Sequence, residues 1–306
     1  MRYWLGVTDN EWFQFLSERK FDEVNFWQPS ATPPFTNLEA GTPFLFKLKR
    51  PHNHIAGFGY FVKYVKLPLT MAWEVFGEKN GASSFAEFEK LIRPLLVGGA
   101  RTSLIEIGCS ILSSPYFFPR ESWIESPLDW STNIVRGKTY DTAQQAGRDL
   151  WLAVQARVSG VEMAQPGVRE PEVRYGEAYL TRARLGQGTF RVLVTEAYQR
   201  RCAITGEHTL LVLEAAHIKP FSEQGPNNTQ NGLLLRSDFH KLFDLGFVTV
   251  TPNLEIEVSP RIKEEWFNGK AYYRLHGQAL AAVPERQSDK PGTEFLKWHN
   301  ENVYIS

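Results

Sequence analysis

Apolar residues over the first 140 positions follow strand-like and helix-like patterns, which predict a domain of mixed α and β structure. Residues 44–49 and 57–62 alternate as half-buried strands do. Residues 85–92 carry apolar side chains at helical spacing directly after Ser84, a residue type that caps helices. Residues 103–112 form a further strand candidate. We therefore expect an α+β fold for this part of the chain.

Beyond residue 200 the pattern predicts a strand, a loop, a second strand and a short helix, in that order. Residues 210–213 form an apolar strand that leads to His217, and residues 233–235 form the second strand. A turn-rich loop separates the two strands. Ser237 or Asp238 can cap the helix that follows.

A stretch rich in glycine and proline separates these two regions and has little hydrophobic periodicity, as linkers do. We expect an N-terminal domain over residues 1–158, a linker over 159–178 and a C-terminal domain over 179–306.

The chain has no net charge, with 34 basic and 34 acidic side chains, so a nucleic-acid site needs a local concentration of positive charge. Residues 180–201 hold five arginines against one glutamate. The expected phosphate-contacting residues are Arg182, Arg184, Arg191 and Lys219. A solvated basic loop is the alternative for each arginine.

The region after residue 200 also holds the side chains that phosphodiester hydrolysis needs, which are a base to activate water and groups to hold a cation. Histidine titrates near neutrality, and His217 stands at the end of the first predicted strand. His240 and Asp244 are four residues apart on the predicted helix, so they share one face. Asn231 can fix the intervening loop or offer an oxygen to the cation.

These residues resemble the HNH (ββα-metal) endonuclease family, through AAHI at His217, NG at Asn231 and FHKLFD at His240. The resemblance implies that His217 is the general base, Asn231 the orienting residue and His240 a ligand of one divalent metal. Mg²⁺ or Mn²⁺ is expected, with Co²⁺ or Ni²⁺ as alternatives. Many members place Asp or His directly before the base, where this chain has Ala216, and Asp244 is our candidate for the other ligand.

The cysteine content excludes a disulfide framework and a cysteine-rich zinc knuckle, because Cys109 and Cys202 are the two cysteines in the sequence. Some HNH members carry paired CxxC motifs, whereas this region has Cys202 alone, so we expect no structural zinc. The N-terminus lacks the apolar core of a signal peptide, and no apolar run approaches the length of a membrane span. We expect a cytoplasmic protein without membrane contact.

The N-terminal region resembles the EVE and wider PUA-like group, which includes readers of modified bases. The resemblance is carried by residues 3–8, 25–30, 41–49 and 55–60. It implies a β-barrel-type domain with flanking helices. A modified base is read after it is turned out of the stack and held between aromatic or apolar walls. Trp27, Trp73 and Ser30 are the expected pocket residues, with ordinary core packing as the alternative for each aromatic.

These observations predict a modification-dependent restriction endonuclease that finds 5-methylcytosine or 5-hydroxymethylcytosine in double-stranded DNA by base flipping. One HNH centre cuts one strand, so a double-strand break implies a homodimer. An HNH nuclease that reads RNA, a phosphorothioate backbone or a nucleotide signal is one alternative. A non-catalytic nucleic-acid-binding protein with a degenerate HNH fold is another; Ala216 favours it, whereas His217, Asn231 and His240 speak against it.

Overall fold

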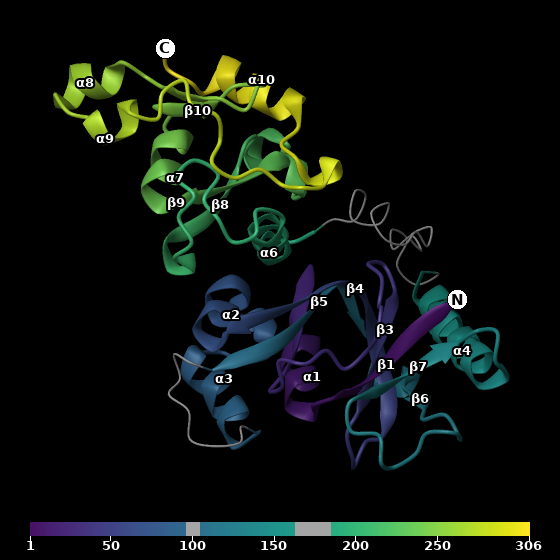
Figure 1. Ribbon diagram of the computed structural model, residues 1–306. Coiled ribbons are helices and arrows are strands. Elements are labelled where there is room, and N and C mark those ends of the chain that lie inside the picture. The colour runs from purple at the N-terminus through teal and green to yellow at the C-terminus, as the bar shows by residue number, and fades with distance from the viewer. Residues whose placement is uncertain (96–104, 163–184) are drawn as a thin grey trace. The chain divides into compact units, whose positions relative to one another are not determined.

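The computed structural model describes residues 1–95, 105–162 and 185–306, and the chain separates into two compact units, Met1–Leu185 and Gly186–Ser306 (Figure 1). Arg182 and Arg184 lie outside the described residues. The predicted linker begins at residue 159, whereas helix α4 (Gln145–Glu162) continues past that position. Both units combine helices and sheets, which confirms the predicted α+β class.

The N-terminal unit is built on one mixed sheet with the strand order β2–β5–β4–β3–β1–β7 and with β6 paired to β4. The strands are β1 (Arg2–Thr8), β2 (Glu23–Gln28), β3 (Pro43–Leu48), β4 (His54–Pro68), β5 (Glu106–Phe117), β6 (Ile124–Glu125) and β7 (Gly137–Asp141). β1 and β3 are parallel, and β4 pairs antiparallel with both β3 and β5. The β4–β5 register shifts next to Phe58 and Phe61, and such bulges bend and twist long strands.

Helices and short 3₁₀ turns flank this sheet (Figure 1). They are α1 (Asn10–Ser17), α2 (Leu69–Phe76), η1 (Gly77–Asn80), α3 (Phe85–Ile92), η2 (Arg93–Leu95), η4 (Arg120–Ser122) and α4. The predicted cap of α3 is confirmed, because the Ser84 side chain accepts a hydrogen bond from the backbone N–H of Glu87. None of the helices described in either unit is long and apolar enough to cross a membrane.

Aromatic side chains fill much of the N-terminal core, which accounts for part of the high aromatic content. Trp12 of α1 meets Phe26 of β2 and Phe46 of β3 edge-on, with ring centroids 5.4 and 5.5 Å apart. Edge-to-face contacts of this kind add about 0.5–1.5 kcal/mol beyond the burial of area. The core therefore joins α1 to the strands through aromatic rings together with aliphatic side chains such as that of Leu16.

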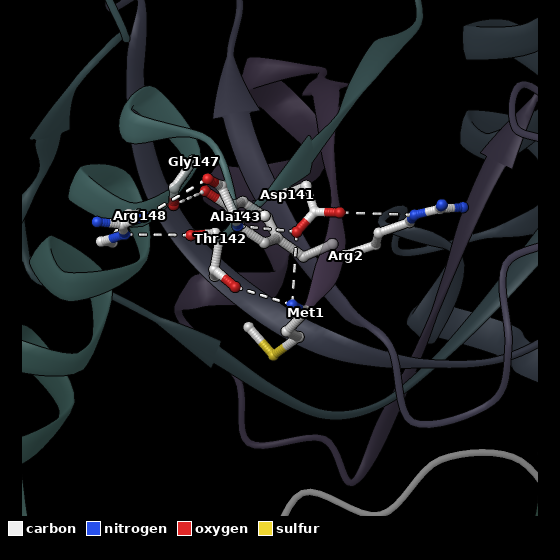
Figure 2. A network of polar contacts seen from close by, with 8 residues as sticks. Met1, Arg2, Asp141, Thr142, Ala143, Gly147 and Arg148 are labelled. Atoms are coloured by element: carbon white, nitrogen blue, oxygen red, sulfur yellow. Dashed lines mark hydrogen bonds and ion pairs between the residues drawn. The ribbon is translucent and has the colours of Figure 1, made fainter.

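A network of polar contacts holds the start of β1 to the end of β7 and the beginning of α4 (Figure 2). The N-terminal ammonium of Met1 donates to Thr142 Oγ1 at 2.8 Å and lies 3.5 Å from Asp141 Oδ1. The guanidinium of Arg148 donates to the Thr142 carbonyl at 3.2 Å. The hydroxyl of the buried Tyr3 donates to the Gly147 carbonyl at 2.7 Å. These contacts close the sheet edge at β7 against helix α4.

The C-terminal unit contains the predicted strand–strand–helix order as β8, β9 and α7. Its elements are α6 (Gln187–Ala197), η5 (Leu210–Val212), β8 (Leu213–His217), η6 (Phe221–Glu223), η7 (Thr229–Asn231), β9 (Gly232–Arg236), α7 (Ser237–Asp244), β10 (Val248–Val250), β11 (Ile256–Val258), α8 (Arg261–Trp266), α9 (Lys270–Tyr273), η8 (Gln287–Asp289) and α10 (Thr293–Asn302). β8 pairs antiparallel with β9, and β10 pairs antiparallel with β11.

Two local predictions for this unit are wrong. Residues 210–212 form a 3₁₀ turn instead of a strand; Leu211 is 76% exposed, and among the described residues the pairing with β9 begins only at Leu213. Helix α7 starts at Ser237 without a side-chain cap. Asp238 lies inside its first turn, where its carboxylate pairs with the Arg236 guanidinium at 2.7 Å. An acidic side chain there still interacts favourably with the helix dipole.

A buried histidine makes the stability of the C-terminal unit pH-dependent. His299 of α10 stacks on Phe243 of α7 with ring centroids 3.7 Å apart. Its Nε2–H donates to the Phe243 carbonyl at 3.1 Å, and its Nδ1 accepts from the Thr249 hydroxyl at 2.8 Å. Burial lowers the pKa of His299 to about 4, against the opposing effect of the hydrogen bond to Phe243.

We therefore expect acid to destabilise this unit between about pH 6.5 and pH 4. The unfolded chain binds a proton at His299 in that window and the folded unit does not, so the free energy of unfolding falls by about 3 kcal/mol as the pH drops. Urea unfolding of the wild type and of His299→Gln across this window measures the effect. The difference between the two should be constant above pH 6.5 and should shrink below it; a constant difference throughout would contradict the prediction.

Candidate active site

The β8–β9 hairpin and α7 bring the predicted nuclease residues into one site. His217, the last residue of β8, pairs in register with Gly232, which directly follows Asn231. A Cβ atom at Gly232 would lie 2.4 Å from Val194 and 3.1 Å from the Phe190 ring, so glycine allows α6 to pack directly on the hairpin. Helix α6 thereby becomes part of the site.

The half-buried imidazole of His217 is held from two sides. Its ring stacks on Phe190 of α6, with centroids 3.8 Å apart and planes 10° apart. Its Nε2 lies 2.8 Å from Asn227 Oδ1. Donation of the Nε2 proton to this oxygen leaves the lone pair on Nδ1. Burial lowers the pKa of His217, the hydrogen bond to Asn227 opposes this, and the charge of His240 lowers the pKa further. The ring is therefore neutral, and able to accept a proton, at neutral pH.

His240 of α7 lies between two carboxylates. Its Nδ1 is 2.5 Å from Oε2 of Glu214, and its Nε2 is 3.4 Å from Oδ2 of Asp244. Burial raises the pKa of Asp244, and the negative charge of Glu214 acts in the same direction, whereas His240 and His217 lower it. The four side chains thus lie close enough to influence one another electrostatically.

Asn231 is fully buried and fixes the loop between the strands. Its Oδ1 accepts from the Lys219 backbone N–H at 2.8 Å, and its Nδ2 donates to the carbonyls of Lys219 at 2.9 Å and Pro226 at 3.0 Å. A Cβ atom at Gly225 would lie 1.8 Å from the Lys219 carbonyl, so the loop also depends on glycine at this position. Of the two roles that the sequence left open for Asn231, these contacts favour the anchoring of the loop.

Three residues of this site were missed at the level of sequence: Phe190, Glu214 and Asn227. The strand pattern could have indicated Glu214, because it stands two residues before Ala216 and alternation places both on one face of β8. Asn227 belongs to a turn-rich segment whose side-chain directions the sequence does not define. Phe190 reaches His217 from a helix whose packing is a long-range feature.

The residues predicted to contact phosphates have different surroundings. Lys219 follows His217 by two residues, and its Nζ lies 5.4 Å from the ring centroid of Trp298 in α10. Arg191 lies on α6 and is partly buried. Arg182 and Arg184 belong to the residues that are not described. Lys219 and Arg191 are therefore the predicted phosphate contacts that stand next to the site along the chain, Lys219 after His217 and Arg191 after Phe190.

The predicted base-pocket residues fall into two places. Trp27 of β2 and Trp73 of α2 both contact the buried ring of Phe88 in α3, with centroids 5.7 and 5.9 Å apart. The indole N–H of Trp27 donates to the Asn80 carbonyl at 2.9 Å. Ser30 lies elsewhere, in the segment after β2. The contacts of the two tryptophans are typical of packing between a sheet and its helices. Such core packing was the alternative that the sequence left open for each tryptophan.

The donor set around His240 suits a divalent cation, since Nε2 of His240 and the carboxylate of Asp244 offer one nitrogen and oxygen ligands on one helical face. Among the described residues no group of three or more His, Cys, Asp or Glu side chains has the spacing of a complete metal site. Two protein ligands are a usual contribution where substrate phosphate and water supply the others.

Comparison with known proteins assigns this centre to a family. Residues 202–251 match the profile of a family described as HNH endonuclease. No curated protein matches the chain. Among solved structures, the ASCH protein from Zymomonas mobilis is 15% identical, with a TM-score of 0.32, over 48% of this chain and 94% of that chain. The modification-dependent restriction endonuclease TagI is 13% identical, with a TM-score of 0.29, over 98% of this chain and 83% of that chain.

The family match begins at Cys202 and spans β8, β9, α7 and β10, which include the residues around His217, Asn231 and His240. The predicted resemblance to HNH nucleases is thereby confirmed for this part of the chain. The C-terminal unit of this protein carries an HNH endonuclease domain.

Proposed function

We propose that this protein is a modification-dependent restriction endonuclease, in which the HNH domain cuts double-stranded DNA and the N-terminal unit selects DNA with a modified cytosine. The observation that carries the nuclease half is the arrangement of His217 opposite His240 and Asp244 on a ββα scaffold. The selecting half is supported by the four stretches that resemble the PUA-like group, which fall on β1, β2, β3 and β4 of one curved sheet.

His217 acts as the general base. Its Nδ1 takes a proton from water as the water oxygen attacks phosphorus, and the bond from phosphorus to the leaving ester oxygen breaks. Asn227 keeps the Nε2 proton in place, and the Phe190 ring fixes the plane of the imidazole. Asn231 positions the loop that follows the base. A side chain whose pKa lies near the working pH suits the role of general base.

His240, through Nε2, and Asp244 would hold one divalent cation, with Mg²⁺ or Mn²⁺ expected and Co²⁺ or Ni²⁺ as alternatives. When bound, the cation neutralises charge that develops on the phosphate. Glu214 accepts the Nδ1 proton of His240 and so directs the Nε2 lone pair toward Asp244. The contact of Glu214 with His240 supports a functional centre over a degenerate one.

The role of Glu214 predicts a specific pattern of metal affinity. We expect Glu214→Ala to weaken Mn²⁺ binding by about 10–100-fold, because His240 loses the partner that orients it. Glu214→Gln should retain most of the affinity, since its amide oxygen still accepts the Nδ1 proton. Calorimetric titration with Mn²⁺ without DNA measures both, with Glu255→Ala, an exposed carboxylate outside this site, as the control. Equal losses in the two variants would instead make Glu214 a direct ligand.

Cleavage of both DNA strands requires two HNH centres, so we propose a homodimer. Trp266 and Phe267, which are 55% and 91% exposed at the end of α8, offer apolar surface for an interface in the C-terminal unit. Sedimentation of the full chain tests this, and a monomer both with and without DNA would contradict it.

Cleavage of matched plasmids that are unmodified or carry 5-methylcytosine or 5-hydroxymethylcytosine tests the proposed function, with Mg²⁺ or Mn²⁺ and with His217→Ala as the inactive control. Cutting confined to modified DNA and lost in the variant is the expected result. Equal cutting of all three plasmids would retain the nuclease and overturn the reading of modified bases. If no plasmid is cut, the same assay on RNA and phosphorothioate DNA decides among the alternatives.

A further inference from the structure

Four buried side-chain polar atoms of the N-terminal unit lack a hydrogen-bond partner among the described residues; Oδ1 of Asn10 and Oδ1 of Asn25 are two of them, and the other two belong to aromatic side chains of the sheet. These two are Nε1 of Trp4 in β1 and the hydroxyl oxygen of Tyr64 in β4. Trp4 is 4% exposed. Buried polar atoms are nearly always paired, and an unpaired one calls for an explanation such as a ligand contact. Burial raises the pKa of Tyr64, and hydrogen bonding of the Gln28 amide toward the phenol oxygen opposes this. The Gln28 Nε2 also donates to the carbonyls of Ser30 and Thr32, and the phenol O–H itself has no acceptor among the described residues.

One ring contacts both side chains. Phe35 meets Trp4 edge-on with centroids 5.5 Å apart, and it meets Tyr64 edge-on at 6.1 Å. It belongs to the segment between β2 and β3, which contains neither helix nor strand, and it is only half-buried. A phenyl ring offers the indole N–H and the phenol no in-plane acceptor. Phe35 therefore packs against Trp4 and Tyr64 but offers neither of them a hydrogen-bond acceptor.

Glycines shape the backbone beside both polar atoms. A Cβ atom at Gly108 would lie 2.2 Å from the Tyr64 hydroxyl oxygen, and one at Gly6 would lie 3.2 Å from Nε1 of Trp4. Close approach of a polar side-chain end to the backbone requires glycine at these positions. Arg136, an exposed cation, acts electrostatically on Tyr64 from the segment before β7. The surroundings thus combine aromatic faces, two hydrogen-bonding groups and one positive charge at the rim.

We propose that Trp4 and Tyr64 form the slot that receives the flipped base, which takes the place of the Phe35 ring. A cytosine turned out of the duplex presents ring-edge acceptors, to which the indole N–H and the phenol O–H donate. Arg136 is placed to meet the backbone phosphate beside it. This inference rests on the proposed reading of modified DNA and replaces Trp27 and Trp73 as the residues of the base site.

Equilibrium binding without cleavage tests the slot. Full-length protein is titrated in EDTA against labelled duplexes with and without 5-methylcytosine. Tyr64→Phe and Trp4→Phe each remove one polar atom and keep a ring, so each should weaken binding to the modified duplex about tenfold and leave the unmodified duplex unaffected. Phe35→Ala should tighten binding to modified DNA, because no ring has to be displaced. Tyr116→Phe, on β5 outside the slot, is the matched control.

Thermal unfolding separates a lost contact from a damaged fold. Tyr64→Phe removes an unpaired buried hydroxyl, so its melting temperature should equal or exceed that of the wild type while its binding falls. If Tyr64→Phe and Trp4→Phe still prefer modified DNA, the proposed slot is overturned and the proposed function remains.

If the wild type binds modified and unmodified duplexes equally well, the proposed function itself is overturned. In that case 5-methyl-2′-deoxycytidine monophosphate serves as the probe of the slot. A thermal shift of the wild type that Tyr64→Phe lacks supports a base site, and no shift in either protein overturns it.

Discussion

Replacement of His217 by alanine is expected to slow DNA cleavage by about 10²–10⁴-fold, the usual contribution of a positioned general base. The side chain is half-buried but lies at the end of β8, where its ring covers Phe190 rather than filling the core. We therefore expect the variant to fold and to bind Mn²⁺ with little change. Single-turnover cleavage at saturating Mn²⁺ measures the effect. His208→Ala, an exposed histidine of the same unit, should retain full activity.

The same residue should set the acidic limit of cleavage. The base works in its neutral form, and burial holds the pKa of His217 below its ordinary value. The rate should therefore persist below about pH 6.5, where an unperturbed histidine is already half protonated. If the cleavage rate instead fell to half its maximum above pH 6.5, a nearby negative charge would outweigh burial. That result would contradict the lowered pKa of His217.

Asn231→Ala is expected to give the second largest effect, and it should act on stability and cleavage together. The substitution leaves the Lys219 N–H and the carbonyls of Lys219 and Pro226 without their partner. Each unsatisfied buried group costs about 1–3 kcal/mol, so with three such groups we expect a loss of at least about 3 kcal/mol in the free energy of unfolding of the C-terminal unit. Urea unfolding of the variant provides the measurement.

Asn231→Asp distinguishes loop anchoring from metal binding. The aspartate keeps an acceptor for the Lys219 N–H but loses both donations, so stability should be intermediate and amide exchange at Lys219 should remain slow. If Asn231 instead supplied an oxygen to the cation, the aspartate would tighten Mn²⁺ binding. Such a gain, with unchanged stability, would refute the anchoring role.

The order of elements in the HNH centre could be predicted because its signals are local. His217 ends an apolar strand, and His240 and Asp244 share a face by helical spacing alone. Glu214 is harder to predict, because many HNH members place Asp or His directly before the histidine, where this chain has Ala216. Alternation along a strand places Glu214 on the same face as Ala216, so the strand pattern indicates a carboxylate on this face.

The proposed slot at Trp4 and Tyr64 could not be predicted from the sequence in the same way. Aromatic residues occur throughout the N-terminal strands, and whether a ring packs or binds depends on partners far away in the chain. Trp27 and Trp73 are joined by Phe88 of α3, whereas Trp4 and Tyr64 are joined by Phe35 of an irregular segment. An unpaired N–H or O–H is a property of three-dimensional packing, which no periodicity reveals.

The stack of Phe190 on His217 has a practical consequence for anyone who would exchange modules between such enzymes. The segment that the family profile recognises begins at Cys202, after helix α6 has ended. A nuclease excised or transplanted at that boundary would lose the ring that stacks on His217, as well as the Val194 contact at Gly232. A transplanted nuclease domain should therefore begin before Gln187. It needs helix α6, which the segment matched by the family does not include.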